Sequence, residues 1–279
     1  MKKFLVLALA LVCVLGVLPV SALTKNGSFG DVPLYKGTIT IDGKKDAIYD
    51  KALKINTAPH SDSTKGDSSA VVSLLHDGSN LYVLVECKSA YALGDYNESY
   101  KDSNAWKTTG IEIITDWTNA AAGQNDCYKY KSWFTSDIWF SLKAAKDDVE
   151  FKATVDKAAK TFIMEYKFKF LAGAKTGSEI GFNLMFDSDK TMGAKSDATR
   201  TIASILPGVD NNGSQFKNIT LSSKEVKAEV ATTAATTAAA KTTTTTKTTT
   251  AAKTADASVV VAVVSVVALA GIVVAKKRK

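Results

Sequence analysis

The chain has 279 residues and a formal net charge of +7, from 35 Lys and Arg against 28 Asp and Glu. The excess lies at the two ends, because residues 23–227 hold 26 basic and 26 acidic side chains. A central region without net charge or a basic run argues against a nucleic-acid-binding protein. Its roughly 205 residues suffice for one domain with a sizeable core.

Residues 1–22 have the organisation of a secretory signal peptide. Lys2 and Lys3 precede a continuous apolar run, Phe4–Val20, and Val20-Ser21-Ala22 offers small residues at the spacing of a cleavage site. We expect cleavage after Ala22, with a retained N-terminal anchor as the alternative.

Residues 23–227 show the period of strands rather than that of helices. About ten short segments rich in β-branched and aromatic residues, several separated by turn signals such as Asp42-Gly43, predict an all-β domain, an antiparallel β-sandwich. Lys45–Ala52 is the one helix-like piece, short enough for a single turn. The expected strands are Gly37–Ile41, Ala70–Leu75, Leu81–Cys87, Gly110–Thr115, Cys127–Ser132, Asp137–Leu142, Val149–Val155, Thr161–Phe170, Glu179–Phe186, Arg200–Ile205 and Phe216–Leu221.

The segment Thr161–Phe170 alternates most clearly. One side carries Phe162, Met164, Tyr166, Phe168 and Phe170, and the other carries Glu165, Lys167 and Lys169. Because successive side chains of a strand point to opposite faces, we expect the aromatic side to face the core.

Cysteine and histidine are scarce in the mature chain. Cys87 and Cys127 can form one disulfide in an oxidising compartment. Neither has a CxxC partner, and His60 and His76 are too few and too separated for a metal site, so no zinc site is expected.

After the domain the chain changes character. Residues 228–257 are almost only Thr, Ala and Lys, which predicts a disordered stalk; a continuous helix is the alternative. Residues 258–275 carry no charge and would span about 27 Å as a helix, which predicts one transmembrane helix. The basic residues 276–279 then lie in the cytoplasm, and the domain lies outside the cell.

This tail is also similar to the sorting signal of Gram-positive surface proteins. Lys253-Thr254-Ala255-Asp256 stands where that signal has a Pro-x-Thr-Gly type of motif, and it contains neither Pro nor Gly. The tail therefore favours single-pass anchoring in the cell membrane, with cell-wall attachment as the alternative.

Five segments in order resemble family 9 carbohydrate-binding modules, members of a DOMON-like β-sandwich superfamily. Together they cover Pro33–Ser222, and they indicate a bacterial surface protein when combined with the two ends. The segments are Gly37–Gly43 with Asp46–Asp50, Asp77–Glu86, Trp106–Ile113, Glu179–Asn183 followed by Asp187 and Asp189, and Phe216–Leu221.

The resemblance implies a non-catalytic module that binds polysaccharide or oligosaccharide through an aromatic platform. In the family the Trp of the third motif stacks on the sugar and the Glu six residues later accepts hydroxyl hydrogen bonds, which places these roles on Trp106 and Glu112. Basic donors would be Lys129 or Lys131 on the following strand, together with Arg200. Tyr100, in the long polar segment before the strand, can widen the platform.

Two departures from the family pattern stand out. Thr109 replaces the family's Asp of the third motif, and Ile205-Leu206-Pro207-Gly208 stands where a second Trp wall is expected. Trp117, Trp133 and Trp139 are candidates for that wall, but Trp residues on or beside strands are more often part of the core.

Strand alternation gives Glu112 a direction. Residues 110, 112 and 114 share one face of the expected strand, so Ile111 and Ile113 should enter the core. Glu112 should then lie on the outer or concave face, where its carboxylate avoids the penalty of burial.

No cofactor is expected, although Asp187 and Asp189 can bind calcium through their oxygens together with Asp197. We expect these acids to be solvated loop residues, with calcium binding as the alternative.

Other function classes find less support. A surface scaffold or adhesion protein that binds other proteins is the alternative to a glycan-binding module. An enzyme is disfavoured because no G-x-S-x-G, H-E-x-x-H or marked glycosidase carboxylate pair occurs. Haem binding would need axial Met or His ligands, and the two histidines sit in a loop and at a strand end.

Overall fold

The computed structural model describes residues 27–60, 68–93, 109–120, 123–134, 138–189 and 200–228. The chain divides into two units, Met1–Ala231 and Thr232–Lys279, and all described residues belong to the first. The expected signal peptide, the transmembrane segment and all but residue 228 of the stalk lie outside the described residues. Within the described ranges no helix has the length and apolar character needed to cross a membrane.

The described residues form thirteen strands and several short 3-10 turns. The turns are η1 (Ala47–Lys51), η4 (Gln124–Asp126), η5 (Lys146–Asp148) and η7 (Gly213–Gln215). The strands are β1 (Ser28–Leu34), β2 (Leu53–Asn56), β3 (Ala58–Pro59), β4 (Ser69–His76), β5 (Asn80–Lys88), β6 (Gly110–Asp116), β7 (Tyr128–Ser132), β8 (Ile138–Leu142), β9 (Val149–Asp156), β10 (Thr161–Lys169), β11 (Glu179–Asp189), β12 (Arg200–Ser204) and β13 (Lys217–Glu225).

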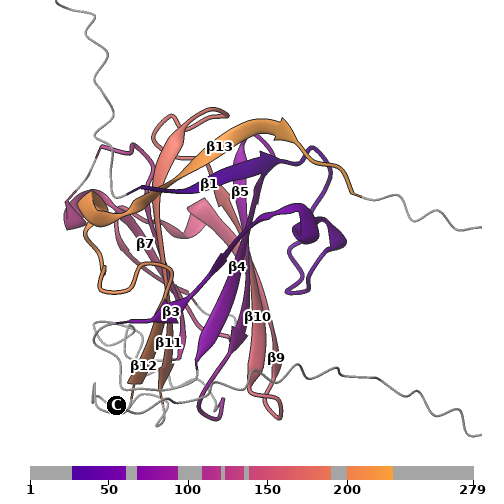
Figure 1. Ribbon diagram of the computed structural model, residues 1–279, viewed down its shortest axis with the longest axis vertical. Helices are drawn as coiled ribbons and strands as arrows, with labels where there is room; N and C mark the ends of the chain where they lie inside the picture. The colour runs from indigo at the N-terminus through magenta and orange to yellow at the C-terminus, as the bar shows by residue number, and fades with distance from the viewer. Residues whose placement is uncertain are drawn as a thin grey trace, which may run out of the picture. The chain divides into compact units, whose positions relative to one another are not determined.

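One continuous sheet folds over to make both layers of a sandwich. Its hydrogen-bonded order is β8-β7-β6-β11-β13-β1-β4-β5-β10-β9, while β12 pairs with β11 and β3, and β2 pairs with β4. Figure 1 shows β1 and β13 crossing one end, with β4, β10 and β9 on one side and β7, β11 and β12 on the other. The predicted all-β sandwich is confirmed.

Two details of that prediction change. The sheet is mixed rather than purely antiparallel, because β1 runs parallel to both β13 and β4. The predicted strand Gly37–Ile41 is wrong, since these residues form no strand in the structure. The strands β1, β2 and β3 were not predicted; they are short or interrupted by Gly30, Pro33 and Pro59, which weaken a strand pattern.

The core lies between the two layers and is rich in aromatic rings. Tyr130 on β7 meets Phe168 on β10 with ring centroids 4.9 Å apart, and Phe162 on β10 meets Phe186 on β11 at 5.4 Å. Edge contacts of this kind are the favoured geometry of aromatic pairs. The aromatic side of β10 therefore faces the core, as its alternation predicts.

The outer face of the β4-β5-β10 layer has its own cover. Ile39, Ile41, Ile48 and Tyr49 from the segment before β2 pack on outward-facing residues of the strands to form a second apolar cluster, completed by Leu75, Tyr82 and Leu84. We call residues 39–49 the cover segment. It explains why Gly37–Ile41 has a strand-like pattern without pairing, because its isoleucines are buried by contact with the sheet.

Both cysteines of the described chain are buried, and no disulfide joins Cys87 to Cys127. Burial raises the pKa of the Cys87 thiol well above its usual range. The disulfide considered from the sequence is therefore not formed in this structure.

Candidate functional site

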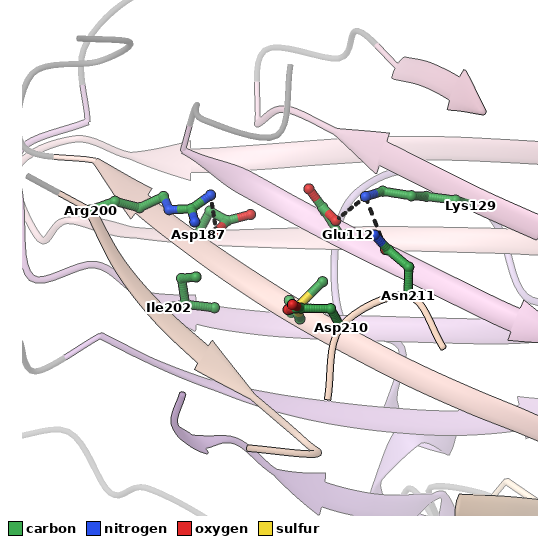
Figure 2. Close-up of a pocket in the computed structure, with 8 residues that line it drawn as sticks. Glu112, Lys129, Asp187, Arg200, Ile202, Asp210 and Asn211 are labelled. Carbon is green, nitrogen blue, oxygen red and sulfur yellow. Dashed lines mark hydrogen bonds and ion pairs between the residues drawn. The ribbon is translucent and has the colours of Figure 1, made fainter. Parts of the chain in front are cut away.

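A pocket of about 220 Å³ opens on the outer face of the layer formed by β6, β7, β11 and β12. Figure 2 shows Glu112 and Lys129 to one side of it, Asp187 and Arg200 to the other, and Asp210 with Asn211 on the loop after β12. Its lining residues are Glu112, Lys129, Met185, Asp187, Arg200, Ile202, Asp210 and Asn211.

Strand alternation and register bring the charged side chains together. Ile111 and Ile113 enter the core, so Glu112 points to the outer face. In the ladders Glu112 lies opposite Lys131 of β7 on one side and Met185 of β11 on the other. Side chains directly opposite one another share a face and come into contact, so one carboxylate lies beside a lysine from the neighbouring strand.

The charged groups form a chain of ion pairs across four strands. Lys129 Nζ lies 2.8 Å from Glu112 Oε2, and Lys131 Nζ lies 3.8 Å from Glu112 Oε1. Lys131 Nζ also donates to Asp187 Oδ2 at 2.6 Å. Arg200 Nη1 closes the chain at 3.6 Å from Asp187 Oδ1. Three cations therefore surround two carboxylates.

The expectation that Glu112 avoids burial is wrong. Glu112 is 2% exposed, and Lys131 is fully buried. Burying an isolated carboxylate would be prohibitive, but a paired and hydrogen-bonded one is tolerated because the neighbouring ammonium groups replace water. The prediction that Glu112 lies on the outer face is confirmed. The lysines, rather than solvent, offset the cost of burying its carboxylate.

The same neighbours set the protonation of the two acids. Burial by itself would raise the pKa of Glu112, but the charges of Lys129 and Lys131 outweigh it and hold that pKa below its usual range. Burial raises the pKa of Asp187, which the Lys131 charge offsets only in part and the Glu112 carboxylate increases further.

The loop after β12 forms one wall of the pocket and contacts residues of β7 and β11 and the residue after β3. Asn183 Nδ2 donates to the carbonyls of Val209 and Asp210 at 2.8 and 2.9 Å. Lys129 Nζ donates to Asn211 Oδ1 at 3.1 Å. The buried His60 places Nε2 3.5 Å from Asp210 Oδ1.

The wall residues were missed from the sequence. Asn183 lies within the fourth motif but carried no predicted role, and Asp210-Asn211 sits in a polar turn of the kind that often carries function. His60 gave no signal, because its partner is 150 positions away in the chain.

The predicted ligand-binding residues fall into two groups. Glu112, Lys129, Lys131 and Arg200 come together at the pocket; Lys131 lies behind its lining. Trp106 and Tyr100 lie outside the described residues.

The three other tryptophans do not line the pocket. Trp117 and Trp133 are each only 2% exposed, as expected of core residues, and Trp139 is half-buried on β8. None of the three supplies a second aromatic wall there.

The calcium alternative finds no support in the described residues. Asp187 and Asp189 are buried on β11, so their interpretation as solvated loop acids is wrong. Asp187 binds Lys131 and Arg200 instead. Across the described ranges no group of three or more His, Cys, Asp or Glu could hold a metal ion; Asp197 lies outside them.

The pocket combines two kinds of surface. Carboxylate, amide, ammonium and guanidinium groups provide hydrogen-bond acceptors and donors along its walls, while Met185 and Ile202 provide aliphatic surface. Such a lining suits a small ligand that carries several hydroxyl groups on an apolar framework.

The sequence matches one family model and a curated protein. A family model described as "Carbohydrate family 9 binding domain-like" matches residues 41–224. Endo-1,4-beta-xylanase C of Paenibacillus barcinonensis is 28% identical over 156 residues, which are 55% of this chain but 14% of the xylanase. The match thus spans a small part of that enzyme's length.

Solved structures share the fold. A family 9 carbohydrate-binding module from Caldicellulosiruptor kristjanssonii in complex with cellotriose matches with a TM-score of 0.56 at 20% identity, covering 72% of this chain and 97% of the module. A family 9 module from the same organism in complex with glucose matches with a TM-score of 0.54 at 18% identity, covering 72% of this chain and all of the module.

Proposed function

The chain belongs to the carbohydrate family 9 binding domain-like family, and from this membership we propose that it binds oligosaccharide or polysaccharide at the pocket of Glu112, Lys129, Asp187 and Arg200. Two of the structures that share its fold hold cellotriose and glucose, so gluco-oligosaccharides are the first ligands to test.

The ion-pair chain of the pocket is the observation that carries this proposal. A sugar hydroxyl both donates and accepts, so it is bound well by alternating carboxylates and cations. Glu112 and Lys129 offer one such pair 2.8 Å apart, and Asp187 with Arg200 offers a second across the pocket. The pairs hold each other in place before the ligand arrives, which reduces the entropy lost on binding.

We propose Trp106 as the aromatic platform on which the sugar stacks. It lies outside the described residues, three positions before Thr109, where the described chain resumes ahead of β6. Stacking of an aromatic ring on the apolar face of a sugar would add to the hydrogen bonds of the pocket.

We further propose that binding is not coupled to catalysis. Hydrolysis of a glycosidic bond needs one carboxylic acid as proton donor and a second carboxylate as nucleophile or base. The Glu112 carboxylate is held in its charged form by Lys129 and Lys131, and Asp187 is bound by Lys131 and Arg200. Both acids are occupied by cations of the protein itself.

The setting at the cell surface is also a proposal. The expected signal peptide and the uncharged segment 258–275 favour an extracellular domain on a single membrane anchor. Protease added to intact cells should release the domain. Protection of the domain until the membrane is broken would contradict this orientation.

Calorimetric titration of the full chain with cellotriose tests the binding proposal. We expect Glu112→Gln to weaken binding by about 1.5–3 kcal/mol, the range for a hydrogen bond to a charged group. Trp106→Ala should abolish binding with little loss of stability. Glu150→Gln, on the exposed side of β9, is the matched control and should bind as the unmodified chain does.

Two results would contradict the proposal. One is an unmodified chain that binds neither cellotriose nor other plant and cell-wall glycans. The other is a Glu112→Gln variant that stays folded and binds with unchanged affinity.

A further inference from the structure

We propose that Met185 and Ile202 form an aliphatic floor on which one pyranose ring lies flat, so that these two residues determine which sugar faces are accepted. This inference rests on the proposed function and adds a contact that neither the charged residues nor Trp106 provides.

The two residues are the apolar part of the pocket. Of the eight lining side chains, six are charged or amide groups, and the remaining two are Met185 and Ile202. Met185 is 5% exposed and Ile202 is 6% exposed. Both side chains line the pocket.

Register fixes what lies beside each of them. Met185 on β11 lies opposite Glu112 on β6, and Ile202 on β12 lies opposite Asp187 on β11. Residues paired in this way share a face of the sheet. Each apolar side chain therefore has a carboxylate next to it, one on each side of the floor.

Arg200 completes the rim of the floor. It lies two residues before Ile202 on the same strand, so both side chains point to the same face. Figure 2 shows Ile202 on the same side of the pocket as Asp187 and Arg200, with Glu112 and Lys129 across from them. Charged groups thus stand around an apolar centre.

That arrangement matches the chemistry of a pyranose ring. The ring carries C–H groups on its faces and directs equatorial hydroxyls outward around its perimeter. A ring that lies flat would place a C–H face on Met185 and Ile202 and its perimeter hydroxyls near the two carboxylate–cation pairs. Burying C–H groups on apolar side chains is favourable in proportion to the area removed from water.

The inferred specificity concerns the face that meets the floor. A sugar whose lower face consists only of C–H groups fits, whereas an axial hydroxyl on that face would lose its water without gaining a partner. Leaving a buried hydroxyl without a hydrogen bond is unfavourable.

Polar substitutions test the floor directly. Ile202→Thr and Met185→Gln keep much of the side-chain volume while replacing apolar surface by polar groups. Titrated with cellotriose, each variant of the full chain should bind about tenfold more weakly, the smaller end of the effect of a missing apolar contact in a pocket. Ile55→Thr is the matched control, since Ile55 is 8% exposed on β2 and does not line the pocket.

The control separates binding from folding. Ile55→Thr should lower the melting temperature about as much as Ile202→Thr does and leave the affinity for cellotriose unchanged. Equal affinities for Ile202→Thr, Met185→Gln and the unmodified chain would overturn the floor while the proposed function stands. Absence of binding by the unmodified chain would instead overturn the proposed function and the floor with it.

A measurement without destabilising variants covers the case in which Ile202→Thr fails to fold. Methyl NMR of the full chain, titrated with cellotriose, should shift the methyl signals of Met185 and Ile202 and leave that of Ile55 in place. Saturation with cellotriose without a shift at Met185 and Ile202 would overturn the inference.

Discussion

Glu112 on β6 and Glu165 on β10 are both buried carboxylates on the outer face of a strand, one in each layer of the sandwich. Around Glu112 the neighbours are ammonium groups, at 2.8 Å for Lys129 and 3.8 Å for Lys131. Around Glu165 they are neutral donors: the backbone N–H groups of Asp42 and Gly43 at 3.1 and 3.2 Å, and the Tyr49 hydroxyl at 3.2 Å.

The pKa values of the two acids move in opposite directions as a result. Burial acts on both, but the lysine charges hold the pKa of Glu112 below its usual range. No comparable charge offsets the burial of Glu165, and its pKa rises to about 7 despite the three hydrogen bonds. Nearby positive charge therefore decides which carboxylate stays ionised.

The two faces also differ in what lies over them. Glu165 lies under the cover segment, where Gly43 has a φ of +78° and an added Cβ would meet the Ala153 backbone at 2.9 Å. Only glycine fits this close approach without strain. The Glu112 face has a wall loop to one side and stays open as a pocket. Closure by a segment of the chain makes a structural site, and an open charged face leaves room for a ligand.

The largest effect should come from removing the central cation of the open face. Lys131→Met would leave the buried Asp187 with Arg200, 3.6 Å away, in place of an ammonium group at 2.6 Å. It would also deprive Glu112 of one ammonium group. We expect the free energy of unfolding in urea to fall by about 3–5 kcal/mol, as for other broken buried pairs. Lys143→Met is the control, because its pair with Asp126 is half-exposed and should contribute at most about 1 kcal/mol. Equal losses for the two variants would show that burial does not distinguish these pairs.

A smaller effect, dependent on pH, should come from the covered face. Because the folded chain holds the Glu165 proton up to about pH 7 and the unfolded chain releases it near 4.5, stability should fall as the pH rises between these values. The loss should approach about 3 kcal/mol well above pH 7. Glu165→Gln imitates the protonated acid, so unfolding free energies measured from pH 4.5 to 8 should depend much less on pH.

Glu150→Gln, on the exposed side of the neighbouring strand, serves as the control and should keep the slope of the unmodified chain. A Glu165→Gln variant with that same slope would mean that Glu165 does not titrate in this range.

The smallest effect should come from one hydrogen bond of the cover. Tyr49→Phe removes the hydroxyl that donates to Glu165 Oε1 and keeps the ring in the apolar cluster. We expect a loss of about 1–2 kcal/mol at pH 8, where Glu165 is charged, and a smaller loss at pH 5. Thermal unfolding at both pH values measures it, with Tyr128→Phe on β7 as control. A loss that is identical at the two pH values would separate the hydroxyl from the titration of Glu165.

Local sequence pattern predicted most of the strands of this protein. Ten of the eleven expected strand segments coincide with observed strands, because side-chain alternation is a local property of the chain. The segment that was wrongly predicted as a strand, Gly37–Ile41, has β-branched residues but no neighbouring strand to pair with. Among the candidate ligand residues, the resemblance to a family supplied Glu112, and strand order supplied Lys129 and Lys131; their role in binding stays a prediction.

The sequence by itself determined ten of the thirteen strands, the core side of β10 and the outward direction of Glu112, since each depends on residues a few positions apart. The tertiary structure alone decided that Glu112 is buried among cations, that Glu165 is buried without one, and that His60, Asn183 and Asp210 meet at one wall. Those outcomes depend on which distant segment covers which face of the sheet. Alternation gives a side chain its face, but burial and electrostatics belong to whatever folds over that face.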